Sequence, residues 1–183
     1  IYSDIDLLKS LVLIEDLSDD VDVLLAKICG RRGMIKETIE LSDRYESNHI
    51  AKTKFNSAIM AAMDKNAKKG RLGVIFELIN NKHINDEVRE HINEALIVGL
   101  KRCATGEESF FGIDGIIDLL EKGENLSKEV KIQINESLKD ALKLCKKDGS
   151  GIHGAIRLIG MDNVNENIKK QAMQSITAGI KKW

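Results

Sequence analysis

Three asparagines recur at matched places in three similar segments of the sequence, FNSAI at 55, INEAL at 92 and INESL at 134. A side-chain amide offers both a hydrogen-bond donor and an acceptor, so a row of asparagines could hold the backbone of an extended peptide. Two of the segments place a glutamate directly after the asparagine, which favours a ligand with some positive charge. The alternative, structural hydrogen bonds between neighbouring repeats, stays open. The candidate peptide-binding residues are Asn56, Asn93, Asn135, Glu94 and Glu136.

Lysines and arginines gather near the ends of the longer predicted helices and in the turns that follow them. The chain has 28 basic and 29 acidic residues, so any attraction for a polyanion must come from this placement rather than from net charge. Such a basic edge could bind a nucleic acid or an acidic protein. Helix dipoles, which favour cations at C-termini by ~0.3–1 kcal/mol each, explain the same placement through stability alone. The candidate anion-binding residues are Arg31, Arg32, Lys68, Lys69, Arg71, Lys101, Arg102, Lys146 and Lys147.

The residue types of common catalytic and metal sites are present, but they lack the spacings that those sites require. The three cysteines show no CxxC spacing, and Cys103 and Cys145 occupy one repeated position, so we expect buried thiols. The four histidines form no HExxH motif or comparable ligand set, and we expect them at solvated or turn positions. We therefore predict no catalytic residue, no metal site and no cofactor.

The composition favours a folded protein of a reducing, cytoplasmic compartment. A hydrophobic content of 43% is ordinary for a globular chain, and three widely spaced cysteines do not suit a disulfide framework. No apolar run approaches the ~18 residues that a membrane helix needs. We expect a cytoplasmic protein with no membrane partner. The chain begins without methionine and ends in a helical pattern, which leaves open that it is part of a longer protein.

A motif of glycine, two variable residues, glycine, an apolar residue and isoleucine occurs four times, as GRRGMI at 30, GRLGVI at 70, GIDGII at 112 and GIHGAI at 151. Its second glycines are separated by 40, 42 and 39 residues, a period typical of stacked helix pairs. We expect the first glycine to end a helix in the left-handed conformation and the second to let the next helix start close to its neighbour. The final isoleucines are predicted to enter the core at one repeated position: Ile35, Ile75, Ile117 and Ile156.

Each repeat is predicted to contain a short helix after the glycines and a longer helix before the next motif. The segments INDEVREHINEAL from 84, LSKEVKIQINESL from 126 and VNENIKKQAMQSI from 164 share the pattern of an amphipathic helix. Asn85, Ser127 and Asn165 stand where the N-caps of these helices belong. The absence of proline and of alternating strand patterns favours an all-α chain.

In its period and pattern the chain resembles the HEAT and armadillo class of α-solenoid proteins over nearly its whole length. The predicted fold is an all-α, right-handed solenoid of about five stacked helix pairs in a single domain. We expect an N-terminal cap pair in residues 1–32, repeats in 33–72, 73–114 and 115–153, and a C-terminal cap pair in 154–183. The resemblance also implies a concave surface of longer helices that binds macromolecules, where armadillo proteins carry a similar asparagine ladder.

These features predict a non-enzymatic module, a scaffold that binds a protein or peptide. The alternative is a binder of an anionic partner, nucleic acid included, along the Lys/Arg edge, and an uncharacterised enzyme ranks third. Salt separates the first two, because phosphate binding weakens steeply as salt rises. Whether the chain forms a homo-oligomer stays open.

Overall fold

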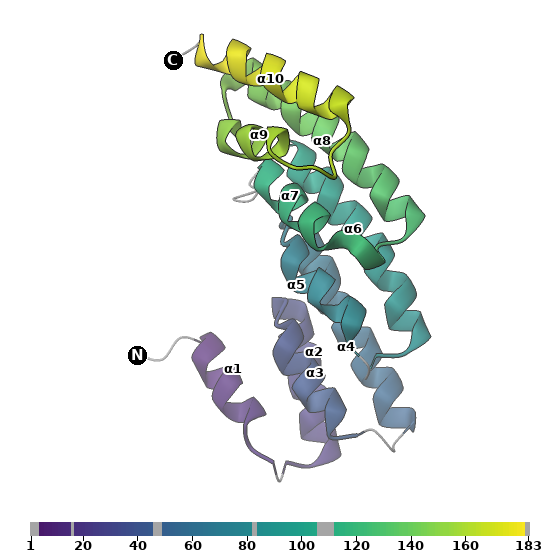
Figure 1. Ribbon diagram of the computed structural model, residues 1–183. Coiled ribbons are helices and arrows are strands. Elements are labelled where there is room, and N and C mark those ends of the chain that lie inside the picture. The colour runs from purple at the N-terminus through teal and green to yellow at the C-terminus, as the bar shows by residue number, and fades with distance from the viewer. Residues whose placement is uncertain (1–3, 16, 46–48, 82–83, 106–111, 182–183) are drawn as a thin grey trace. The chain divides into compact units, whose positions relative to one another are not determined.

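A computed structural model of the protein describes residues 4–15, 17–45, 49–81, 84–105 and 112–181, whose helices are drawn in Figure 1. Within these ranges the chain forms ten α-helices and two short 3-10 helices, η1 and η2, and no strand. The predicted all-α class is confirmed. Short helices alternate with longer ones from α2 onward, as the repeat predicts.

The chain divides into two compact units. The first unit comprises Ile1–Asn66 and Glu77–Ala95, and the second comprises Ala67–Phe76 and Leu96–Trp183. The chain passes from one unit to the other within two of its longer helices, α4 and α6. The division therefore does not follow the predicted repeat boundaries, which stay a prediction.

The first unit is built around its first three helices. It contains α1 (Asp4–Val12), α2 (Asp19–Arg32), α3 (Ile35–Asp43), nearly all of α4 (His49–Ala67), η1 (Glu77–Asn80) and the first half of α6 (Asp86–Thr105). Helix α1 packs against both α2 and α3. The core between them is closed by Phe55 of α4, whose ring stacks on Tyr45 with centroids 5.3 Å apart.

The second unit consists of two layers of helices. It contains α5 (Leu72–Phe76), the second half of α6, α7 (Gly112–Lys122), η2 (Gly123–Asn125), α8 (Lys128–Asp148), α9 (Ile152–Ile159) and α10 (Glu166–Ile180). The short helices α5, α7 and α9 pack against one another in sequence order, and the long helices α8 and α10 pack side by side (Figure 1). Helices α8 and α10 therefore share an outer face.

The motif glycines fulfil their predicted roles only in part. Gly149 rather than Gly151 ends α8, and a β-carbon added at Gly73 would meet no atom within 4 Å, whereas one at Gly154 would stand 2.3 Å from Ile113 of α7. Gly70, Gly112 and Gly151 have positive φ angles of 66°, 37° and 70°. In the first repeat the left-handed residue is instead the second glycine, Gly33, which ends α2 at φ 79°. Gly30 lies inside α2, where an added β-carbon would stand 2.4 Å from the Ala58 oxygen of α4. The close approach of two helices thus replaces the expected turn at Gly30.

Three of the four motif isoleucines are core residues, and the fourth is not. Ile35, Ile75 and Ile117 are 3%, 0% and 0% exposed, as predicted, whereas Ile156 is 54% exposed. At 100° per residue, Ile156 lies about 200° around α9 from Gly154, which faces α7. In the described part of the chain α9 is the last of the row of short helices, so no further helix covers this side. The prediction that Ile156 is buried is wrong for that reason.

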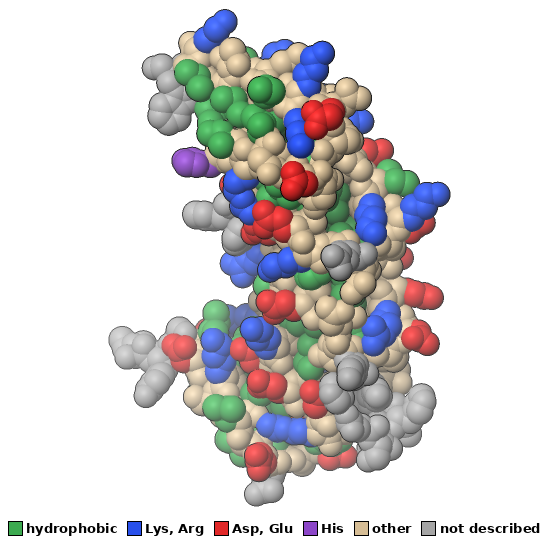
Figure 2. All heavy atoms as spheres, in the orientation of Figure 1, with side chains coloured by type: hydrophobic (Ala, Val, Ile, Leu, Met, Phe, Trp, Pro, Cys, Tyr) green, Lys and Arg blue, Asp and Glu red, His purple; other side chains and the backbone are tan. Residues whose placement is uncertain are grey.

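Apolar side chains are also exposed on the neighbouring helix α10. Figure 2 shows them gathered over α9 and α10, and the exposed large apolar residues of these two helices are Ile156, Met173 and Ile180. Within the described residues, Met173 and Ile180 lie on the final long helix, α10, and Ile156 lies on the final short one, α9.

All three predicted N-caps are confirmed. The side-chain oxygens of Asn85, Ser127 and Asn165 each accept a hydrogen bond from the backbone N–H three residues later, at 3.0, 3.3 and 3.0 Å. These contacts satisfy donors that the first helical turn leaves without partners. They fix where the long helices α6, α8 and α10 begin.

Candidate binding surfaces

The three asparagines of the predicted ladder have different environments. Asn56 on α4 is buried, with 5% of its surface exposed, while Asn93 on α6 is half-buried and Asn135 on α8 is exposed. The Asn135 amide nitrogen donates to the Lys131 oxygen at 3.1 Å, one turn earlier on the same helix. Asn56 and Asn93 belong to the first unit and Asn135 to the second. Burial favours the structural alternative at Asn56, and the ladder stays a prediction.

The two predicted glutamates also differ. In the first unit, Glu94 lies 3.3 Å from Nδ1 of His91, whose Nε2 lies 2.8 Å from Asp64 on α4. His91 therefore stands between two carboxylates and links α6 to α4, which the sequence interpretation of a solvated histidine missed. In the second unit, Glu136 projects into a groove between α8 and α10.

The α8–α10 groove has a volume of about 410 Å³ and a mixed polar lining. Two amide side chains from α10, Gln171 and Gln174, face charged residues from α8. Among these, Lys143 is paired with Asp140 at 2.8 Å. Leu142 adds an apolar contact to the lining. Such a groove combines donors, acceptors and both signs of charge on one face.

The predicted basic residues line different hollows or are exposed, and the basic edge stays a prediction. In the second unit Lys68, Lys101 and Arg102 surround a hollow of about 480 Å³ beside the exposed Val98. Of the others, Arg71 lines a second hollow, Lys146 lines the α8–α10 groove, and Lys69 and Lys147 are exposed. Arg31 and Arg32 belong to the first unit, where Arg32 lies 3.6 Å from Asp4.

The second hollow, between α5 and α7 in the second unit, is mostly apolar and was not predicted. Its volume is about 360 Å³. Its apolar lining includes Leu72, Val74, Phe76 and Leu119. The signal that sequence reasoning could have used is the second residue of the motif, which is arginine at 71 and isoleucine at 113.

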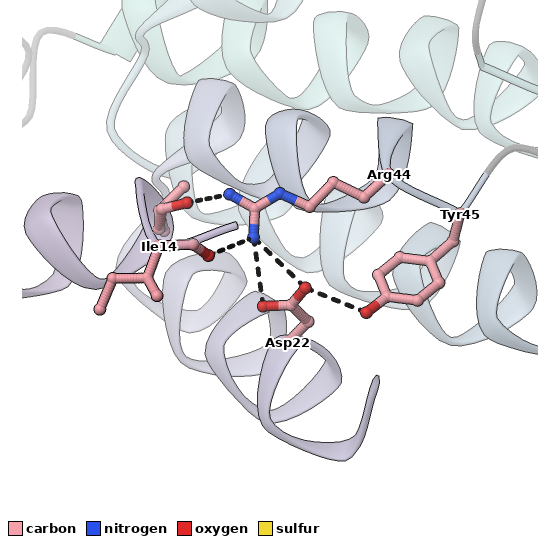
Figure 3. Close-up of polar contacts among 5 residues, drawn as sticks. Ile14, Asp22, Arg44 and Tyr45 are labelled. Carbon is pink, nitrogen blue, oxygen red and sulfur yellow. Dashed lines mark hydrogen bonds and ion pairs between the residues drawn. The ribbon is translucent and has the colours of Figure 1, made fainter. Parts of the chain in front are cut away.

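A buried ion pair in the first unit was also missed. Asp22, which is 1% exposed, lies 3.3 Å from the Arg44 guanidinium and accepts a hydrogen bond from the Tyr45 hydroxyl at 3.0 Å (Figure 3). Arg44 also donates to the backbone oxygens of Val12 and Ile14, the latter at 2.9 Å. Val12 is the last residue of α1, where carbonyls lack helical partners, and Ile14 lies in the turn that follows. The cluster therefore fastens α1 to α2 and α3.

The cluster borders a cavity and keeps its phenol protonated. A cavity of about 570 Å³ adjoins it and is lined by further carboxylates, Glu15, Glu40 and Asp43. Burial, followed by the hydrogen bond to Asp22, raises the pKa of Tyr45 to about 12. A phenol with that pKa stays protonated at neutral pH and keeps donating to Asp22.

The cysteines are buried, as predicted. Burial, with a smaller contribution from Glu37, raises the pKa of Cys29 to about 11, and burial alone raises that of Cys103 to about 12. Burial and then Asp148 raise the pKa of Cys145 as well. The Cys103 thiol donates to the Gly70 oxygen at 3.3 Å. The nucleophile is the thiolate, and the raised pKa values keep these buried thiols protonated at neutral pH.

Metal-binding groups and membrane-spanning helices are absent from the described residues. In those ranges no group of three or more His, Cys, Asp or Glu side chains is placed to hold a metal ion. None of the helices there combines the length and apolar character needed to cross a bilayer. Of the histidines, His153 is exposed, while His83 and the side chain of His49 lie outside what is described.

No protein-family model matches this sequence, and neither a curated protein nor a solved structure is detectably similar to it.

Proposed function

We propose that the protein is a right-handed α-solenoid of the HEAT and armadillo type that binds an extended peptide segment of a partner protein. The observation that carries the proposal is the α8–α10 groove of about 410 Å³, where glutamine amides of one long helix face charged side chains of the next. Adjacent long helices form this type of surface repeatedly in a stack of helix pairs.

The lining of the groove suits a peptide backbone. Gln171 and Gln174 each offer a donor and an acceptor, which is what one peptide unit requires. They are separated by three residues, so they lie on the same side of α10. An extended chain advances ~3.3 Å per residue, which allows it to reach both amides and then the facing residues of α8. The charged residues Glu136, Lys139 and Lys146 would read the side chains of the ligand.

The test is a selection of binding peptides from a displayed random library, followed by fluorescence anisotropy with the best peptide. The double change Gln171→Ala with Gln174→Ala should weaken binding at least about tenfold, equivalent to ~1.4 kcal/mol. Asn167→Ala, an exposed amide on the same helix outside the groove, is the matched control and should bind as the unchanged protein does. Equal affinity of the double variant and the control would remove the groove from the proposal.

A second candidate function is anion binding at the hollow of Lys68, Lys101 and Arg102. The observation that favours it is the convergence of three cationic side chains on one hollow of about 480 Å³. The changes Lys68→Glu and Lys101→Glu should abolish retention on heparin while the circular dichroism spectrum stays unchanged. Binding of a polyanion should also weaken steeply with salt, whereas the peptide groove should respond less. A wild-type protein that heparin does not retain would rule this function out.

A further inference from the structure

The hollow between α5 and α7 exists because one motif residue differs from its counterpart in the next repeat. Between α7 and α9 the corresponding space is filled by Ile113, whose Cγ2 lies 2.3 Å from the place of a β-carbon at Gly154 and 2.9 Å from that at Gly151. Ile113 is the second residue of its motif. Its counterpart one repeat earlier is Arg71, which is exposed.

The consequence of this difference is an open apolar surface. Gly115 is the counterpart of Gly154, so the equivalent apolar cover over Gly115 would have to come from residue 71. Arginine keeps its guanidinium in water instead. The structure therefore has a hollow of about 360 Å³ with Leu72, Phe76 and Leu119 in its lining. The space between α7 and α9 is therefore filled, whereas the equivalent space between α5 and α7 stays open.

The charges at the rim of the hollow favour an anionic ligand. Arg71 and Lys122 line it, and within the described part of the chain neither forms an ion pair. The acidic residue of the rim, Asp118, is paired with Arg157 of α9 at 2.9 Å. Arg157 also binds Asp114 and Glu121, which draws the acidic face of α7 toward α9. The cations of the rim are thus the charges that remain to be matched by a ligand.

The size of the hollow limits the apolar part of that ligand. Ligand cavities in proteins commonly measure ~300–1,000 Å³, and this hollow stands near the lower end of that range. One bulky aliphatic or aromatic side chain with its flanking backbone suits this volume better than a large cofactor does. Its neighbours in the ligand would then lie at the rim, beside Arg71 and Lys122.

We propose that the α5–α7 hollow is a second binding site, which takes one bulky apolar side chain from an acidic peptide segment. The apolar residue packs on Leu72, Phe76 and Leu119, and flanking carboxylates pair with Arg71 and Lys122. The site extends the proposed function, since its ligand is again a peptide, but it lies on the short helices and shares no lining residue with the α8–α10 groove.

The test uses short acetylated and amidated peptides as probes in an amide NMR titration of the full chain. A peptide with a central leucine between pairs of glutamates should shift signals of residues 70–76 and 115–122. Replacing that leucine with alanine should weaken binding about tenfold, and replacing the glutamates with lysines should abolish it. Equal binding of the leucine and alanine peptides, shifts confined to the α8–α10 groove, or no shift at all would overturn the proposal.

Two variants of the protein sharpen the test. Arg71→Ile should fill the hollow as Ile113 does in the next repeat and remove the response to the acidic leucine peptide. Arg71→Gln removes the same charge but leaves a polar side chain, so the preference for leucine over alanine should persist at lower affinity. A leucine preference that survives Arg71→Ile would count against the hollow as its source.

Two further variants separate this site from the proposed function and from a folding defect. Lys122 is exposed, so Lys122→Glu should weaken binding of the acidic peptide without changing the circular dichroism spectrum of the folded protein. The double change Gln171→Ala with Gln174→Ala should bind the acidic leucine peptide normally. Loss of library-selected peptides in that variant with intact leucine-peptide binding would show that the two sites act independently. An unaffected Lys122→Glu variant would contradict the assigned role of the rim.

Discussion

Ile113 packs directly on Gly154, with its Cγ2 atom 2.3 Å from the position that a β-carbon at residue 154 would take. Ile113 is only 4% exposed, so it has little room to move away. We expect Gly154→Ala to lower the free energy of unfolding by about 1–3 kcal/mol, the usual cost of overpacking a core. Urea denaturation followed by circular dichroism measures this. A variant of unchanged stability would show that α7 and α9 separate easily.

Gly73 holds the same motif position two repeats earlier and should behave in the opposite way. A β-carbon there would meet no atom within 4 Å, and its φ angle is not positive. Alanine in place of a helical glycine stabilises by roughly 0.5–1 kcal/mol, because the unfolded chain loses freedom. We therefore expect Gly73→Ala to raise the urea midpoint. A lowered midpoint would mean that the motif glycine is needed here for packing as well.

The isoleucines of the motif provide a second matched pair. Ile117 is fully buried, so Ile117→Ala should cost about 2–5 kcal/mol through lost burial and the cavity left behind. Ile156 is 54% exposed, and Ile156→Ala should change stability by no more than about 0.5 kcal/mol. The same denaturation experiment compares them. Similar costs for both variants would indicate that Ile156 is covered in solution, for instance by a second copy of the chain.

The Arg44 cluster should be a major source of stability in the first unit. Arg44→Ala leaves the buried Asp22 carboxylate without its cation, which typically costs about 3–5 kcal/mol. Tyr45→Phe removes one hydrogen bond and should cost about 0.5–1.5 kcal/mol. The control is Arg32→Ala, whose pair with Asp4 is exposed and worth at most about 1 kcal/mol. Thermal unfolding of the three variants should rank them in that order, and an Arg44→Ala variant as stable as the control would contradict the assignment.

Stability should fall at alkaline pH. The pKa values of Cys29, Cys103 and Tyr45 rise to about 11, 12 and 12 in the folded protein, from ordinary values of 9.0, 9.0 and 10.0. Between the ordinary and the raised values the folded chain keeps protons that the unfolded chain has lost, so the free energy of unfolding decreases as pH rises. The decline should begin near pH 9 for the thiols and near pH 10 for Tyr45.

The measurement is urea denaturation at a series of pH values from 8 to 12. Tyr45→Phe should remove part of the decline above pH 10 and leave the part that begins near pH 9. At pH 8 a thiol reagent should label the native protein slowly and the unfolded protein fast, because the native thiols are buried and protonated. A stability curve that stays flat from pH 8 to 12 would contradict these pKa shifts.

Local patterns in the sequence carried most of the information about the fold. The N-caps at Asn85, Ser127 and Asn165 were predictable because a cap depends on one side chain and the turn beside it. The burial of Ile75 and Ile117 followed from the period of the motif. Ile156 fits the same pattern but is exposed, because within the described residues no further short helix follows α9 to cover it.

The surfaces were less predictable, because they depend on contacts between distant residues. The pair of Asp22 with Arg44 joins positions 22 residues apart that share no motif. The hollow between α5 and α7 follows from Arg71 alone, once the structure shows what Ile113 does at the equivalent place. Asn56 and Asn135 occupy one position of the repeat, yet one is buried and the other exposed. Equivalent positions therefore did not ensure equivalent environments.

The asparagine ladder can now be tested residue by residue. Asn56 is 5% exposed, so Asn56→Ala should lower stability by about 1–3 kcal/mol, the cost of disturbing a buried polar site.

Asn93 and Asn135 retain exposed surface, and the double change to alanine should reduce affinity for the library-selected peptide more than it reduces stability. Anisotropy with that peptide and urea denaturation, run on the same protein samples, compare the two losses in the same units. An additional loss of binding in the Asn56→Ala variant, at temperatures where it remains folded, would show that the buried residue acts with the other two. If the double variant instead loses stability and binds normally, Asn93 and Asn135 are structural, and recognition would rest on Gln171 and Gln174.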